Sequence, residues 1–186
     1  MINEINKCIE ILKMGGLILY PTDTVWGIGC DATNEAAVKK IYQLKQREDT
    51  KSMIVLVAND AMLNKQVVEV PELAWNIIDI ATKPTTIVYP IAKNLAKNLV
   101  AENESIALRM VKEGFVNQLV YRFNKPLVST SANLSHKTTP TNFLEISDEI
   151  KAGVDFIVNQ KFDTGNHQPS SIIKLGLAGE IKIIRK

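Results

Sequence analysis

The sequence predicts a layered α/β domain with a mixed sheet, and two observations carry this prediction. Segments with apolar residues at helical spacing alternate along the chain with short apolar runs typical of buried strands. No linker is long enough to divide the 186 residues, a length that suits one domain with a well-buried core. We therefore expect a single domain over residues 1–186.

The first elements follow from the pattern of apolar residues. A first helix ends at Gly15 and has four such residues on one face: Ile5, Cys8, Ile9 and Leu12. Residues 17–20 form a short apolar run that predicts a buried strand, and Pro21 ends it because proline has no N–H to donate. A second helix, capped by Thr33 or Asn34, is indicated by Ala37, Val38, Ile41 and Leu44.

The rest of the chain continues this alternation. Pro71 suits the first turn of a helix, and residues 176–179 suit the turn of a hairpin. The expected elements are a strand at 53–57, a helix from 71 to about 81, strands at 85–89 and 105–108, a helix at 115–123, a strand at 127–130, a helix at 142–150, and strands at 156–158, 171–175 and 181–184.

Composition excludes several classes of protein. The two cysteines and two histidines show no metal-ligand spacing, so no protein-bound transition metal is expected. No apolar run approaches the roughly 20 residues of a membrane span, and the N-terminus lacks the apolar region of a signal peptide. A cytoplasmic location without membrane contact is therefore expected. The net charge of +2 is too small to indicate nucleic-acid binding by itself.

A cluster of hydroxyls follows the first predicted strand. Thr22, Asp23 and Thr24 stand where open α/β sheets place their ligands. Gly27 and Gly29 let the backbone turn and approach a ligand closely. A capped turn before the next helix is the alternative interpretation. Similar polar clusters recur four more times along the chain, and this recurrence favours a ligand site.

A run of cations and a single arginine stand near predicted strands. The run 45–51 follows a helix, where lysine and arginine often only complement the helix dipole on a solvated face. The functional alternative is a phosphate clamp, with Arg47 as a planar fork and Lys51 as a mobile point charge. Arg109 follows a buried strand and needs an anionic partner if it faces a cleft, yet the nearest acids in the sequence are at 104 and 113.

The segment 126–135 has the densest polar cluster of the chain. Five polar side chains lie within the seven residues that follow Val128, and they suit either a turn or a site that surrounds a polar ligand. Residues 163–165 and 169–173 repeat the pattern. The chain has no phosphate-binding P-loop, no dinucleotide fingerprint and no hydrolytic triad in a motif context.

Four separated motifs carry a resemblance to a known family. They are Tyr20-Pro-Thr-Asp-Thr-Val-Trp-Gly-Ile-Gly29, Lys45-Gln-Arg47 with Lys51, Thr130-Ser-Ala-Asn-Leu-Ser135 and Pro169-Ser-Ser-Ile-Ile173. In order and spacing, the chain from about Ile9 to Arg185 resembles the YrdC/TsaC family in its single-domain form. The resemblance implies a twisted α/β sheet flanked by helices, with a concave, basic ligand cavity.

The resemblance also implies an activity. Members of the family are L-threonylcarbamoyladenylate synthases, nucleotidyltransferases that make threonylcarbamoyl-AMP and pyrophosphate from L-threonine, bicarbonate and ATP. Mg²⁺ would accompany ATP. The product serves N6-threonylcarbamoyladenosine modification of tRNA, so tRNA and the proteins of the downstream threonylcarbamoyl transfer are the implied partners.

Carried over residue by residue, the resemblance implies two binding sets. Those for L-threonine are Thr24, Arg109, Ser131 and Ser170. Those for ATP are Arg47, Lys51, Ser105, Asn133, Thr141 and Arg185. Arg47 and Lys51 are also the expected catalytic residues, because cations aimed at phosphoryl oxygens stabilise the charge that develops there.

The chain departs from the family pattern at Leu56, Lys83 and His136. Leu56 stands where some relatives have a histidine that helps to hold threonine, which implies one polar contact fewer. A YciO-like paralogue with the same fold and another activity stays open, as does a module that binds double-stranded RNA. Aromatic residues make up only 6% of the chain and no basic stripe is interleaved with them, which favours the enzyme.

Overall fold

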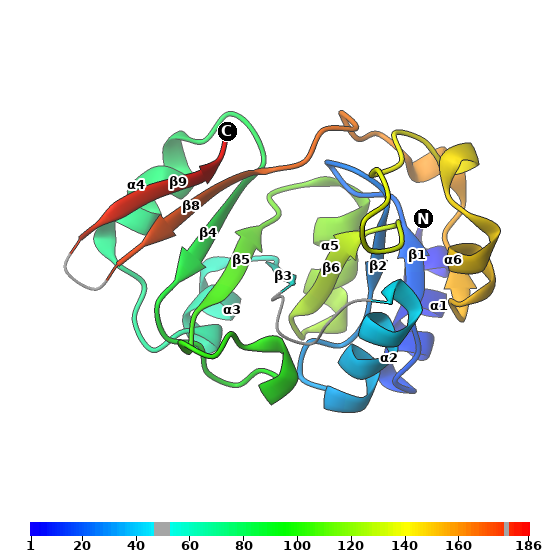
Figure 1. Cartoon of the computed structure of the whole chain (residues 1–186), viewed down its shortest axis with the longest axis horizontal. Helices are drawn as coiled ribbons and strands as arrows, with labels where there is room; N and C mark the ends of the chain where they lie inside the picture. The colour runs from blue at the N-terminus through cyan, green and yellow to red at the C-terminus, as the bar shows by residue number, and fades with distance from the viewer. Residues whose placement is uncertain (47–52, 177–178) are drawn as a thin grey trace.

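A single nine-stranded sheet organises the protein, whose structure is a computed structural model describing residues 1–46, 53–176 and 179–186 (Figure 1). The strand order is β7-β1-β2-β6-β3-β5-β4-β8-β9. The strands are β1 (Ile18–Tyr20), β2 (Gly27–Gly29), β3 (Ile54–Val57), β4 (Thr85–Tyr89), β5 (Ile106–Met110), β6 (Leu127–Ser131), β7 (Phe156–Ile157), β8 (Ser171–Leu175) and β9 (Ile181–Arg185).

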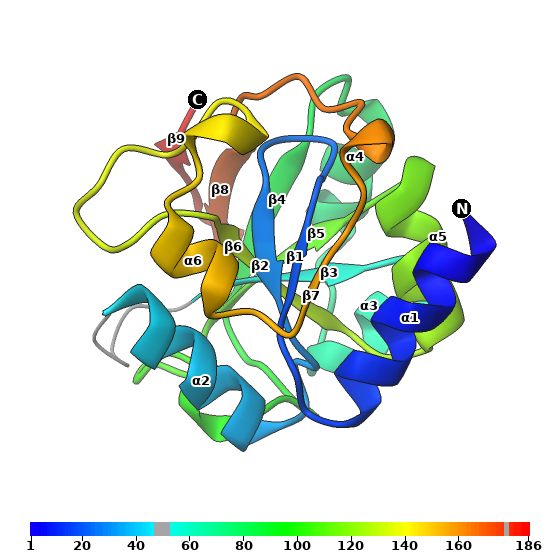
Figure 2. The same ribbon diagram turned by 90° about the vertical axis from the view of Figure 1, so that its right-hand side faces the viewer.

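Helices lie on both sides of this sheet. The α-helices are α1 (Ile2–Lys13), α2 (Glu35–Lys45), α3 (Asp60–Gln66), α4 (Glu72–Ile80), α5 (Gly114–Phe123) and α6 (Asp148–Ala152), and the short 3₁₀ helices are η1 (Lys97–Leu99), η2 (Phe143–Glu145) and η3 (Gln160–Phe162). Figure 2 shows α1 and α5 together on one side of the strands and α2 and α6 on the other. None of the helices in the described ranges is long and apolar enough to cross a membrane.

The sheet is mixed, as the alternation of helices and strands predicts. The pairs β1/β7, β3/β5 and β4/β8 are parallel, whereas the other neighbouring strands are antiparallel. Two of the parallel pairs join distant segments, with Ile18 beside Phe156 and Thr85 beside Ser171. The α/β class with helices flanking a mixed sheet is therefore confirmed, and both ends of the chain contribute to the sheet.

Local sequence explains the first two helices. In α1 the predicted face is buried at Ile5, Cys8 and Leu12, and Gly15 follows the helix with a φ of 73°, a conformation that glycine adopts without strain. In α2 the N-cap is Asn34, whose side-chain oxygen accepts a hydrogen bond from the backbone N–H of Ala37. Of the two predicted caps, Asn34 is therefore the one that the structure uses.

The segment Gly27–Gly29 forms a strand, although its glycines predict a turn. This strand, β2, pairs with β1 on one side and β6 on the other. A Cβ atom on Gly29 would lie 2.7 Å from the Tyr20 ring and 2.9 Å from the Val128 carbonyl oxygen. Glycine is needed here because its neighbours come too close for a side chain, so the turn prediction is wrong.

Three helical predictions also change. α3 is a short helix that the apolar pattern does not indicate, and the Asn59 side chain caps it. The single helix expected at 142–150 is two short helices, because Asn142 caps η2 and Ser147 caps α6. Pro71 is the residue before α4 and not part of its first turn.

The hairpin predicted near the C-terminal end is present. β8 and β9 pair antiparallel, and the Gly176 N–H donates to the Glu180 carbonyl oxygen at 2.9 Å. Every residue of β9 is exposed, including Ile181 and Ile183. This strand forms one edge of the sheet.

Candidate ligand-binding site

A cavity of about 240 Å³ brings together predicted site residues from distant parts of the chain. It is lined by Thr24, Val25, Gly27, Met53, Ile54, Arg109, Ser129, Thr130, Ser131, Thr139, Pro169, Ser170, Ile172 and Arg185. All the residues predicted for L-threonine are in this set, together with Arg185, which is predicted for ATP. A larger cavity of about 570 Å³ includes none of the residues predicted for L-threonine or ATP, so the smaller one is the candidate site.

The loop after β1 holds Thr24 in a fixed place. The Thr22 hydroxyl accepts a hydrogen bond from the Thr24 N–H at 3.0 Å and donates to the Val25 carbonyl oxygen at 2.7 Å. The two threonine hydroxyls are 2.8 Å apart. Both side chains are buried, so this loop is a built wall of the cavity and not a solvated turn.

Arg109 lies on β5 and is only 3% exposed. Its Nη1 donates to both carboxylate oxygens of Asp23 at 2.5 Å. Its Nε is buried without a hydrogen-bond partner among the described residues. The sequence suggests no acid for Arg109, and the structure supplies Asp23 from 86 residues away.

Ser170 and Arg185 form a second polar group. The Ser170 hydroxyl lies 2.7 Å from the Thr86 hydroxyl, and both residues are buried. The Arg185 Nε donates to the Ser170 carbonyl oxygen at 2.7 Å. Partial desolvation lowers the pKa of the Arg185 guanidinium, which nevertheless stays charged near neutral pH. A cation therefore lies at the start of β8 beside a row of hydroxyls.

Lys45 supports the third wall of the cavity from below. Its side chain is 2% exposed, and its Nζ donates to the Ser131 carbonyl oxygen at 2.5 Å and to that of Asn133. The interpretation of this residue as part of a solvated helix end is wrong. Val38, Ile41 and Lys45 share one helical face, and this spacing is a signal that places Lys45 on the buried side.

Three predicted ATP residues do not line the cavity. Ser105 precedes β5, so it is roughly 13 Å along the strand from Arg109. The Asn133 amide donates to two carbonyl oxygens in its own turn. The Thr141 N–H and hydroxyl both donate to the exposed Glu145, and these bonds lower the pKa of that carboxyl. Their contact with ATP stays a prediction.

The predicted catalytic residues Arg47 and Lys51 lie outside the described residues, and their roles stay predictions. Leu56 is fully buried on β3, in register with Arg109 on β5. Among the described residues, no group of three or more His, Cys, Asp or Glu side chains is arranged to hold a metal ion.

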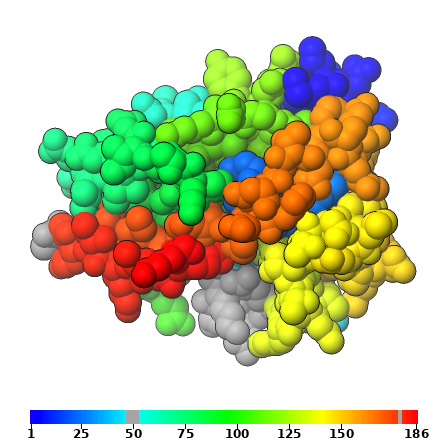
Figure 3. All heavy atoms as spheres, turned by 90° about the horizontal axis from the view of Figure 1, so that it is seen from above, coloured from blue at the N-terminus to red at the C-terminus, as the bar shows by residue number. Residues whose placement is uncertain are grey.

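A segment from the C-terminal third closes over the loop after β1. The Trp26 Nε1 donates to the Asp163 carboxylate at 2.8 Å. A Cβ atom on Gly165 would lie 2.5 Å from the Thr22 carbonyl oxygen and 2.9 Å from that of Thr24. In Figure 3 this part of the chain, in orange, runs across the blue residues of the first strands. The two segments therefore support each other.

The sequence analysis assigns no ligand contact to Asp23, Lys45 or Thr86. Helical spacing alone could identify Lys45 as buried. Asp23 follows β1 and Thr86 is the second residue of β4, but no local pattern tells which other polar residues they meet. Their partners are 86 and 84 residues away.

The fold and the cavity define an α/β protein with a polar candidate site, and comparison with known proteins identifies its family. The family model for Sua5, YciO and YrdC proteins, described as "Telomere recombination", matches residues 10–186. The chain belongs to this family.

The relatives with curated names share one description. The chain is 36% identical over 173 residues to a threonylcarbamoyl-AMP synthase of Pseudoalteromonas translucida, covering 91% of this chain and 92% of the relative. It is 32% identical over 188 residues to one of an Enterobacter species, covering 96% and 94%.

Solved structures agree with the fold. P. abyssi Sua5 complexed with L-threonine superposes with a TM-score of 0.82 at 26% identity, and the alignment covers 92% of this chain and 50% of that one. The chain thus spans about half the length of this Sua5 protein. E. coli YciO has a TM-score of 0.80 at 23% identity, with 98% and 88% covered, and shows the fold.

Proposed function

We propose that this protein is a threonylcarbamoyl-AMP synthase that uses L-threonine, bicarbonate and ATP. The observation that carries the proposal is Arg109, a buried guanidinium that lines a cavity together with six serine and threonine residues. An arginine fork suits the carboxylate of an amino acid, and hydroxyls suit its other polar groups. The names of the curated relatives and the L-threonine complex of P. abyssi Sua5 support the same substrate.

The proposed reaction has two steps. The amine of threonine adds to the carbon of bicarbonate and water leaves, which gives a carbamate. A carbamate oxygen then attacks the α-phosphorus of ATP, the bond to the bridging oxygen breaks, and pyrophosphate leaves. Thr24, Ser131 and Ser170 orient the threonine, so that much of the catalysis comes from positioning.

Cations stabilise the charge on the phosphoryl oxygens in this proposal. Arg185 lies at the cavity beside Ser170, and Arg47 and Lys51 would act from the segment between α2 and β3. Ser105, Asn133 and Thr141 would complete the ATP site. Mg²⁺ enters with ATP as part of the substrate. We further propose that the product serves tRNA modification in the cytoplasm, through proteins that transfer the threonylcarbamoyl group.

Incubation of the purified protein with MgATP, L-threonine and bicarbonate tests the proposal. Pyrophosphate release should require both threonine and bicarbonate, because the carbamate forms before it attacks. Mass spectrometry should detect the acyl-adenylate. Pyrophosphate release that is unchanged when either substrate is omitted would exclude this reaction. Chelation of transition metals, with Mg²⁺ replaced, should leave the rate unchanged.

A further inference from the structure

We infer that Asp23 is a positioning residue for substrate recognition: it holds the Arg109 guanidinium from behind and leaves the other edge for the carboxylate of the amino acid. The inference rests on the proposed function and adds a residue to it. Its basis is the geometry of one ion pair, the position of that pair between two cavities, and the support of the loop that carries Asp23.

The ion pair uses only one end of the guanidinium. Both carboxylate oxygens of Asp23 accept from Nη1, at 2.5 Å. The Nε is buried and has no partner among the described residues. A guanidinium binds a carboxylate in a bidentate manner through two neighbouring N–H groups. With Nη1 taken, the edge formed by Nε and Nη2 is left for a second carboxylate.

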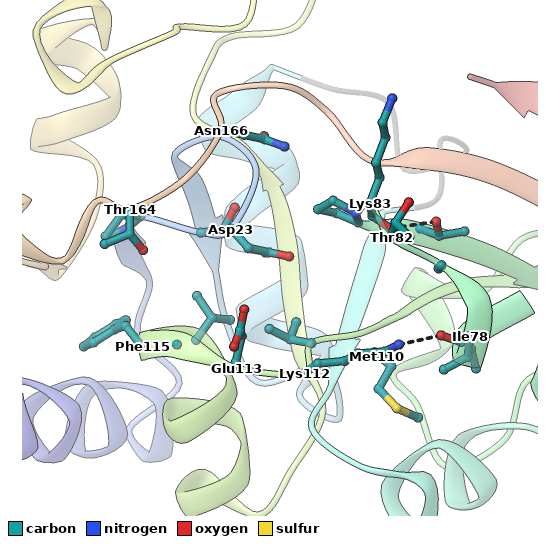
Figure 4. A pocket seen from close by; sticks show the side chains of 18 of the residues that line it. Asp23, Ile78, Thr82, Lys83, Met110, Lys112, Glu113, Phe115, Thr164 and Asn166 are labelled. Carbon is teal, nitrogen blue, oxygen red and sulfur yellow. Dashed lines mark hydrogen bonds between the residues drawn. The ribbon is translucent and has the colours of Figure 1, made fainter.

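The two partners belong to different cavities. Arg109 lines the candidate site of about 240 Å³, whereas Asp23 lines the larger cavity of about 570 Å³. Figure 4 shows Asp23 in the wall of the larger cavity, between Asn166 and Glu113. Asp23 therefore contacts Arg109 without lining the cavity that Thr24, Ser131 and Ser170 line. A carboxylate in the candidate site does not have to displace it.

The loop that carries Asp23 is fixed on both sides. Thr22 and Thr24 bond to each other within the loop, and the backbone at Gly165 lies against their carbonyl oxygens. The Asp23 side chain is 35% exposed, whereas that of Arg109 is 3% exposed. Asp23 thus neutralises a buried cation at a fixed position, and a buried cation without such a partner would reorient or draw in water.

Steady-state kinetics of Asp23→Asn test this role. Asparagine keeps the shape of the side chain and removes its charge. The KM for threonine should rise about tenfold to a hundredfold, the range typical for partners that orient a binding group, while the KM for ATP changes less than about threefold. Glu113→Gln is the matched control, since it also removes a carboxylate from the wall of the larger cavity. Both KM values of this control should equal those of wild type.

A double-mutant cycle with Arg109→Lys separates positioning from a general loss of stability. If Asp23 acts through Arg109, adding Asp23→Asn to Arg109→Lys should raise the KM for threonine by less than about twofold further. An unchanged KM for threonine in Asp23→Asn would overturn the inference. A lowered KM would also overturn it and would mean that Asp23 competes with the substrate.

Two further measurements keep the result decisive. If Asp23→Asn does not fold, Asp23→Glu takes its place. We expect Asp23→Glu to raise the KM for threonine by a smaller factor. A wild-type KM for threonine in Asp23→Glu would contradict the inference. The NMR signal of the Arg109 Nε–H, assigned from its loss in Arg109→Lys, should shift in Asp23→Asn without any substrate. This signal does not depend on turnover, so an inactive wild-type enzyme would refute the proposed function while an unmoved signal would refute the role of Asp23.

Discussion

Replacement of Lys45 by methionine should loosen the wall of the candidate site that contains Ser131. The Lys45 Nζ lies under the turn after β6 and donates to the carbonyl oxygens of Ser131 and Asn133. Methionine fills a similar volume but donates no hydrogen bond. The variant therefore removes the support of this turn without opening a large cavity.

The cost can be worked out from these contacts. A buried carbonyl oxygen that loses its donor costs about 1–3 kcal/mol, so two of them cost about 2–6 kcal/mol. Ser131 and Asn133 are half-buried, and water replaces part of the lost bonds. We therefore expect a loss of about 2–4 kcal/mol, which corresponds to a fall in Tm of about 4–16 °C for a domain of this size.

Thermal unfolding followed by circular dichroism measures this loss. Lys39→Met is the matched control, because Lys39 lies on the exposed side of the same helix. The free energy of unfolding of this control should change by no more than about 0.5 kcal/mol, with a correspondingly small change in Tm. In Lys45→Met the KM for threonine should also rise, because Ser131 belongs to the loosened turn. A variant with wild-type Tm and wild-type KM would show that Lys45 does not stabilise the turn that contains Ser131 and Asn133.

Replacement of Arg47 or Lys51 by alanine should weaken ATP binding by about 1.5–3 kcal/mol with little effect on Tm. An unchanged affinity for ATP in calorimetric titrations would mean that these side chains do not contact ATP. Arg109→Lys should raise the KM for threonine more than that for ATP, because lysine keeps the charge but not the two-point geometry; a KM effect on ATP alone would assign Arg109 to the nucleotide. Serine should be a poor but detectable substrate, since one methyl group is worth only about 1–3 kcal/mol in discrimination. Burial raises the pKa of Cys8 to about 12 and that of Cys30 as well, so neither thiol should react with Ellman's reagent at pH 8 until the protein unfolds. The same raised pKa values mean that stability falls as the pH rises above about 8.5, where the thiols of the unfolded chain ionise.

Features of the fold that follow from short segments could be predicted from the sequence. The buried face of α1 and the strands β4 and β8 follow from the spacing of apolar residues, which local geometry determines. β2 could not be predicted in this way. Its glycines are required by the closeness of β1 and β6, and that closeness exists only in the folded sheet.

Part of the candidate site could likewise be predicted from the sequence, and part could not. Residue types and their place near strands indicate the polar clusters that contain Thr24, Ser131 and Ser170, and the family resemblance selects these three residues. The structure brings them to one cavity. The pairing of Asp23 with Arg109 could not be predicted, because several charged residues stand at strand ends and only the register of the sheet decides which of them meet. Helical periodicity could have placed Lys45 on the buried face of α2, but a charged side chain is more often exposed to solvent.

The position of Ser170 and Arg185 near the C-terminal end of the sequence has a consequence for co-translational folding. Translation delivers the chain from its N-terminus, so Thr24 leaves the ribosome long before either of them. Until β7 arrives to pair with β1, and β8 to pair with β4, the first strands lack neighbours that they have in the finished sheet. A nascent chain that ends before Ser170 therefore lacks the side chains of Ser170 and Arg185, which line the candidate site, so a substrate that needs them stabilises only the longer chain.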